Sequence, residues 1–141
     1  LPYIEPLEGD DVHCSEMGLQ GSRSAEVLKL WLGIRQLGEN GIEQLLVNAI
    51  DRRCYLEENI DSNKIKILSG PLHLISFTPK NSTKDESLKW SVETRVKLLK
   101  KKFMLSRPLH EGHFYLKAVM GNPHTKKKHL DLLSLHLNES V

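Results

Sequence analysis

A short glycine and serine run is the first candidate for chemistry in this chain. Gly21-Ser22-Arg23-Ser24 directly precedes an apolar stretch that predicts a helix. Backbone N–H groups at the start of a helix, together with a serine hydroxyl and the positive end of the helix dipole, suit a bound phosphate. The same residues also suit ordinary N-capping by Ser22 or Ser24. On spacing alone, capping is the favoured interpretation and a phosphate site is the alternative.

The seven histidines raise the possibility of a metal site. His110 and His113 are three residues apart across a predicted turn, and His124 and His129 flank a run of lysines. Neither an HExxH nor a CxxC motif is present, although these are the spacings that zinc sites commonly use. The pattern favours exposed loop histidines and predicts no metal site.

Two lysine clusters, residues 97–102 and 126–128, could together form an anion-binding face. No aromatic stacking platform accompanies them, because Trp90 stands alone among charged residues. A solvated helix end is therefore favoured, and nucleic-acid binding is kept as a minor alternative. The remaining serine, histidine and acidic residues form no motif that places a nucleophile beside a base.

The composition describes an ordinary globular chain of 141 residues, 39% hydrophobic and 27% charged, with a net charge of +2. This is one domain's worth of sequence, and no apolar run approaches the ~20 residues that a membrane helix needs. We expect a soluble, cytoplasmic protein, since the two cysteines, Cys14 and Cys54, form no disulfide framework. The chain begins with Leu1, so we expect a processed start or a piece of a longer protein.

The first half of the chain predicts an arm followed by two helices. Residues 1–21 are rich in proline, glycine and acidic residues and read as an extended arm. A helix begins at about Ser22, is apolar on two faces, and ends at Gly38. A second helix, over residues 41–60, carries an apolar stripe and turns Asp51, Arg52 and Glu57 toward solvent.

The second half predicts an antiparallel sheet with two more helices. Residues 65–67 and 72–77 alternate as a hairpin around Gly70-Pro71. Strands are also predicted over residues 103–106 and 113–119. The predicted helices have apolar stripes formed by Leu88, Val92, Val96 and Leu99, and by Leu130, Leu133 and Leu137. The sequence thus predicts the α+β class, an antiparallel sheet covered by helices.

Three blocks resemble a known family. The first is Gly18–Ser24 running into Leu28-Lys29-Leu30-Trp31-Leu32, the second is Met104–Leu109, and the third is Phe114–Pro123. Together they resemble the C-terminal third of the fold-type-I amino-acid decarboxylases that depend on pyridoxal 5'-phosphate (PLP). This group includes the glutamate, cysteine-sulfinate, diaminobutyrate and aromatic-amino-acid decarboxylases.

The resemblance implies a place for this chain in a larger enzyme. Residues 1–60 would be the arm and helices at the end of the PLP-binding large domain, and residues 61–141 the small C-terminal domain. The enzyme would be a homodimer with its active site at the subunit interface. Ser22 would bind the cofactor phosphate of the partner subunit, with Gly21 and Arg23 shaping the loop, which shifts the weight from capping toward function. Lys117 stands where relatives usually carry an arginine that pairs with the carboxylate of the amino-acid substrate. The alternative, of equal weight, is a lysine that reaches solvent from the edge of the sheet.

The resemblance also shows what this chain lacks. The family binds PLP through a lysine that follows a histidine, and this sequence contains no His-Lys pair. The aspartate that pairs with the pyridine nitrogen and the aromatic residue that stacks on the ring belong to the large domain, and cofactor electronics depend on them. We expect the chain alone to be inactive and not to hold PLP. The alternative is a non-catalytic interaction domain that keeps the decarboxylase fold, and the sequence does not tell which amino acid is the substrate.

Overall fold

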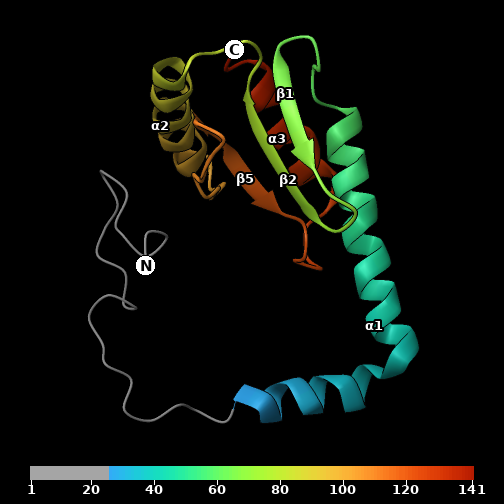
Figure 1. The fold of residues 1–141 in the computed structure, drawn as a ribbon. Helices are drawn as coiled ribbons and strands as arrows, with labels where there is room; N and C mark the ends of the chain where they lie inside the picture. The colour runs from blue at the N-terminus through green and yellow to red at the C-terminus, as the bar shows by residue number, and fades with distance from the viewer. Residues whose placement is uncertain (1–25) are drawn as a thin grey trace, which may run out of the picture. The chain divides into compact units, whose positions relative to one another are not determined.

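The computed structural model describes residues 26–141, and these form three helices and five strands. Contacts divide the chain into two compact units, residues 1–38 and residues 39–141. Figure 1 shows the sheet and helices of the second unit. The elements are α1 (Glu26–Glu58), β1 (Ile65–Ser69), β2 (Leu74–Pro79), α2 (Lys84–Lys100), β3 (Leu109–His110), β4 (His113–Phe114), β5 (Leu116–Val119) and α3 (Lys127–Asn138).

Helix α1 consists of two helical segments that meet at Gly38. This glycine has φ 65° and ψ −177°, a conformation outside the helical range. A positive φ is costly for residues that carry a Cβ, so glycine is the residue that permits the break. The predicted end of the first helix at Gly38 is confirmed, whereas its predicted start at Ser22 lies outside the described residues.

The main sheet has three antiparallel strands in the order β1-β2-β5, with β2 in the centre. Of the strand predicted over residues 103–106, only a single bridge forms, between Ser106 and Lys117. The strand predicted over residues 113–119 is interrupted, because the N–H of Tyr115 bonds to the carbonyl of Pro108. Residues 113–114 instead pair with β3 in a separate two-stranded sheet. The predicted hairpin of β1 and β2 is confirmed.

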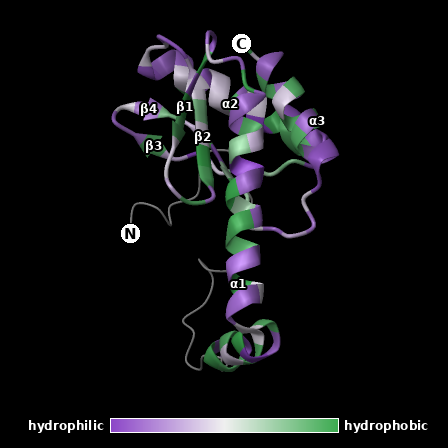
Figure 2. Ribbon diagram, turned by 90° about the vertical axis from the view of Figure 1, so that its right-hand side faces the viewer, coloured by the Kyte–Doolittle hydropathy of each residue, from purple (hydrophilic) through white to green (hydrophobic). Residues whose placement is uncertain are grey.

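The hydrophobic core of the second unit lies on one face of the three-stranded sheet. Ile75, Phe77 and Leu116 point into it from the sheet and are fully buried. Helix α3 adds the predicted stripe of Leu130, Leu133 and Leu137, and the end of α1 adds Leu56. In Figure 2 α3 carries both apolar and polar residues, as a helix with one buried face should. The α+β class with helices on an antiparallel sheet is therefore confirmed.

Helix α2 buries a different face from the one predicted. Its buried residues are Ser87, Ser91, Thr94 and Leu98, whereas Val96 and Leu99 of the predicted apolar stripe are largely exposed. Hydrogen bonds make the burial of these serines possible. Ser87 Oγ donates to the Lys84 carbonyl at 2.7 Å and accepts from the N–H of Phe114 at 3.1 Å. A small hydroxyl on α2 therefore satisfies a backbone donor of β4.

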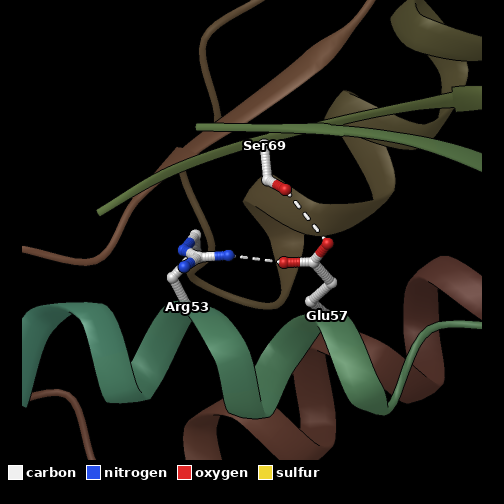
Figure 3. A network of polar contacts seen from close by, with 3 residues as sticks. All are labelled: Arg53, Glu57 and Ser69. Atoms are coloured by element: carbon white, nitrogen blue, oxygen red, sulfur yellow. Dashed lines mark hydrogen bonds and ion pairs between the residues drawn. The ribbon is translucent and has the colours of Figure 1, made fainter. Parts of the chain in front are cut away.

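The second segment of α1 is tied to the sheet by polar side chains. One carboxylate oxygen of Glu57 accepts a hydrogen bond from Arg53 Nη1 at 2.6 Å. The other oxygen accepts one from Ser69 Oγ at 3.0 Å. Figure 3 shows these three side chains. Arg52 Nε donates to the carbonyl of Met120 at 2.9 Å. Arg52 and Glu57 are half-buried, so their predicted solvent-facing position is wrong. The helical period alone placed them there, and it contains no information about the sheet edge that they meet.

Candidate functional site

Lys117 lies in β5 on the sheet face opposite the core. Its neighbours Leu116 and Ala118 are buried, whereas Lys117 is half-buried and Val119 is 54% exposed. This is the alternation predicted for a strand with one covered face. The lysine therefore belongs to the outer face of the sheet, together with Leu74 and Ser76 of β2.

Two serines flank Lys117 in register across the sheet. Ser76 is its partner on β2, and Ser106 is its partner on the other side. The bridge to Ser106 is a closed pair, in which the Lys117 N–H donates at 2.8 Å and the Ser106 N–H donates at 3.2 Å. Side chains of directly paired residues project from the same face, with Cβ atoms ~4.5–5.5 Å apart. We call Ser76, Lys117 and Ser106 the polar row.

The polar row has the chemistry of a carboxylate site. An ammonium group supplies the positive charge, and each flanking hydroxyl can donate a hydrogen bond to an anionic oxygen. Lysine is a point charge without the fork by which arginine orients a carboxylate. Flanking serines could supply part of the orientation that this lysine lacks.

Two contacts fix the end of β5 beyond Lys117. The N–H of Met120 donates to the His73 carbonyl at 2.9 Å, and the Met120 carbonyl accepts from Arg52 Nε at 2.9 Å. Arg52 is thus a positioning residue that the sequence did not reveal. The sequence carries no signal for this role of Arg52, because an arginine on the polar face of a helix resembles any other solvent-exposed charge.

Arg107 is a positive charge that the fold buries. It follows Ser106, is only 6% exposed, and its guanidinium carbon lies 5.2 Å from the centre of the Phe114 ring. A cation over an aromatic face is held by the ring quadrupole. Arg107 belongs to the block Met104–Leu109 that resembles the family, but the burial of an arginine cannot be predicted from its neighbours in sequence.

The predicted cofactor loop lies outside the described residues. Gly21, Ser22 and Arg23 all belong to this part of the chain, so their proposed role stays a prediction. Within residues 26–141 no group of three or more histidine, cysteine or acidic residues could hold a metal ion. In the same part of the chain, no helix is both long and apolar enough to cross a membrane.

Tyr55 and Glu86, two groups of the surrounding scaffold, have shifted pKa values. Tyr55 donates to Asp131 Oδ1 at 2.5 Å, and this hydrogen bond, aided by desolvation and the negative charge, raises the pKa of Tyr55. The backbone N–H and the hydroxyl of Thr83 both donate to Glu86, and these bonds lower the pKa of Glu86. Both groups stabilise helix positions around the sheet.

Several solved structures have an architecture similar to that of this chain. Mouse CSAD in the apo form superposes with a TM-score of 0.68 and 22% identity, over 94% of this chain and 31% of that chain. Oryza sativa TDC with PLP and tryptamine gives a TM-score of 0.71 and 16% identity, over 94% and 30%. Catharanthus roseus tryptophan decarboxylase with L-tryptophan gives 0.67 and 18%, over 81% and 26%. The chain has the fold of the C-terminal part of PLP-dependent amino-acid decarboxylases.

The decarboxylase likeness covers nearly all of this chain but only about a third of the matched structures. Identities of 16–22% establish the fold and leave the chemistry to the residues. No protein-family model matches the chain, and no curated protein matches it. Lys117 and its flanking serines therefore carry the functional argument.

Proposed function

We propose that this chain is the C-terminal part of a PLP-dependent amino-acid decarboxylase, a carboxy-lyase. The observation that carries the proposal is the position of Lys117 in a decarboxylase-type fold. It lies on the sheet face opposite the core, flanked in register by Ser76 and Ser106. An ammonium with two neighbouring hydroxyls suits the carboxylate of an amino-acid substrate.

Lys117 binds and orients the substrate in this proposal. Its charge attracts the carboxylate, and the flanking serines restrict the angle at which the carboxylate sits. PLP, when bound, supplies the electron sink for the loss of CO₂. The described residues fit the carboxylate end of a substrate, whereas the phosphate end of the cofactor is assigned to Ser22, with Gly21 and Arg23 shaping the loop.

The complete enzyme is proposed to be a cytoplasmic homodimer with its active site at the subunit interface. Residues 1–60 form the end of its large domain, and residues 61–141 form its small domain. The Schiff-base lysine comes from outside this chain, since no lysine here follows a histidine. The 141-residue chain alone is therefore inactive and contributes the phosphate loop, the substrate-facing strand and dimer surface.

The experiment compares the complete protein with the isolated chain. CO₂ release is measured for each with PLP and with glutamate, cysteine sulfinate, diaminobutyrate and aromatic amino acids as substrates. The proposal expects release by the complete protein from at least one substrate and none by the isolated chain. If the complete protein has a His-Lys pair and intact fold but releases no CO₂ from any of them, the decarboxylase proposal fails.

The second candidate is a non-catalytic interaction domain with the same fold. Two observations favour it. Lys117 stands at the position where the family resemblance implies an arginine. An open apolar groove, lined in part by lysines, lies elsewhere on the domain. A preceding coding sequence without a His-Lys pair would support this candidate over the enzyme.

A further inference from the structure

An open apolar groove lies where the end of α2, the end of β5 and the start of α3 meet. Its volume is about 550 Å³, and its walls are formed by residues 101–105, 118–120, 122, 125, 129–130 and 132–133. All of these residues belong to the compact unit of residues 39–141. The groove is separate from the polar row, since neither Lys117 nor its serine partners line it.

Large apolar side chains in this groove remain exposed. Met104 is 75% exposed, Val119 is 54% exposed and Leu132 is 48% exposed. They come from three different segments and meet at one site. Contiguous exposed apolar surface on a domain with a complete core marks an interaction site more often than chance placement.

The charge around the groove is positive. Lys101, Lys102 and His129 line it, and no acidic residue is among its described lining residues. Lys126–Lys128 are exposed at the start of α3 beside His129. Residues 97–128 contain nine lysines and arginines and a single acidic residue, Glu111. The two lysine clusters seen in the sequence thus flank one apolar surface.

We propose that this groove docks an acidic amphipathic peptide segment of a partner protein. Leucine-type side chains of the segment would cover Met104 and Leu132, and its carboxylates would face the lysines, as in helix-in-groove recognition. The open shape favours a peptide, because a small ligand would leave most of the exposed apolar area uncovered. Nucleic acid fits less well, since the half-buried Phe103 is the one phenylalanine, tyrosine or tryptophan among the described lining residues of the groove.

The probe is a fluorescent 18-residue helical peptide with leucines on one face and glutamates on the other. Fluorescence anisotropy with the full 141-residue chain should show saturable binding. A sister peptide with lysines in place of the glutamates should bind at least tenfold more weakly. Equal binding of both peptides would overturn the proposal, because the lysines would then contribute nothing.

Groove variants locate the binding. Met104→Glu, and separately Lys101→Glu with Lys102→Glu, should each weaken peptide binding tenfold or more. The matched controls are Leu109→Glu, at a leucine 55% exposed outside the groove, and Lys84→Glu with Lys89→Glu at the other end of α2. The controls should stay within twofold of the wild type, and circular dichroism checks that all variants fold.

Two further outcomes would overturn the proposal. One is loss of peptide binding in the controls as large as in the groove variants, which would indicate general charge attraction. The other is Met104-dependent binding to phosphatidylserine vesicles or to a single-stranded oligonucleotide at least as tight as peptide binding. This second result would assign the groove to a membrane surface or to a nucleic acid.

Discussion

Thr83 and Glu86 form a reciprocal cap at the start of α2. Thr83 Oγ1 accepts from the N–H of Glu86 at 3.3 Å, and the N–H of Thr83 donates to Glu86 Oε2 at 2.7 Å. The carboxylate also lies at the positive end of the helix dipole. These contacts favour the charged form of Glu86 in the folded chain, which is why its pKa is lowered.

The cap predicts a pH dependence of stability. Because folding lowers the pKa of Glu86 below its ordinary 4.5, its contribution is present above pH 4.5 and is lost as the pH falls through the folded-state pKa. Glu86→Gln should therefore lose less melting temperature than the wild type between pH 6 and pH 3. Asp85→Asn, in the same first turn, is the control. Equal pH dependence in Glu86→Gln and the wild type would contradict the assignment.

The positions of some functional side chains could be predicted from the sequence, and those of others could not. Strand alternation, which is a local property, separates Lys117 and Val119 from the buried Leu116 and Ala118. The pairing of Lys117 with Ser76 and Ser106 could not be predicted, because strand register depends on which strands pair. The half-buried position of Arg52 and the buried position of Arg107 also depend on contacts across the fold. The role of Gly21, Ser22 and Arg23 in binding the cofactor phosphate stays a prediction.

At the scale of elements, α2 shows most clearly where periodicity fails. Apolar spacing favoured a stripe through Val96 and Leu99, yet the helix buries serines and a threonine. Small side chains allow close approach, and Ser87 accepts the N–H of Phe114 at 3.1 Å. The sequence predicted the presence of α2. Which face of α2 is buried depends on contacts across the fold, such as the hydrogen bond from the N–H of Phe114 in β4.

Ser87→Ala should lower the free energy of unfolding by about 1–3 kcal/mol, because the buried N–H of Phe114 loses its acceptor. Ser91→Ala is a matched control. Ser91 is as buried as Ser87, and its hydroxyl donates to the carbonyl of Leu88 in its own helix. Urea denaturation should therefore show a small change for Ser91→Ala. Equal losses in the two variants would refute the role given to Ser87.

At the scale of the whole molecule, the first segment of α1 has an unusually apolar surface. Val27 is 74% exposed, and Leu30, Trp31 and Ile34 are also exposed. The sequence predicted this helix to be apolar on two faces, and such a helix normally has cover on both. The chain spans about a third of the matched decarboxylase-type structures, and in our proposal the complete enzyme supplies that cover.

The isolated chain should therefore show weak hydrogen-exchange protection at residues 27–34, or it should self-associate through them. Residues 116–119 should stay protected, because β5 has hydrogen-bonded partners on both sides. Exchange by mass spectrometry, with the oligomeric state measured in parallel, separates the cases. Protection of residues 27–34 equal to that of β5 in a proven monomer would contradict this prediction.

The central claim is that Lys117 binds the carboxylate of an amino-acid substrate, and steady-state kinetics of the complete enzyme test it most directly. Lys117→Met should lower kcat/KM by tenfold or more, about 1.4 kcal/mol, and raise KM, whereas Lys117→Arg should preserve or improve turnover. Lys66→Met, in an exposed position on β1, is the control and should keep wild-type kinetics. Wild-type kinetics in Lys117→Met would show that this side chain never meets the substrate.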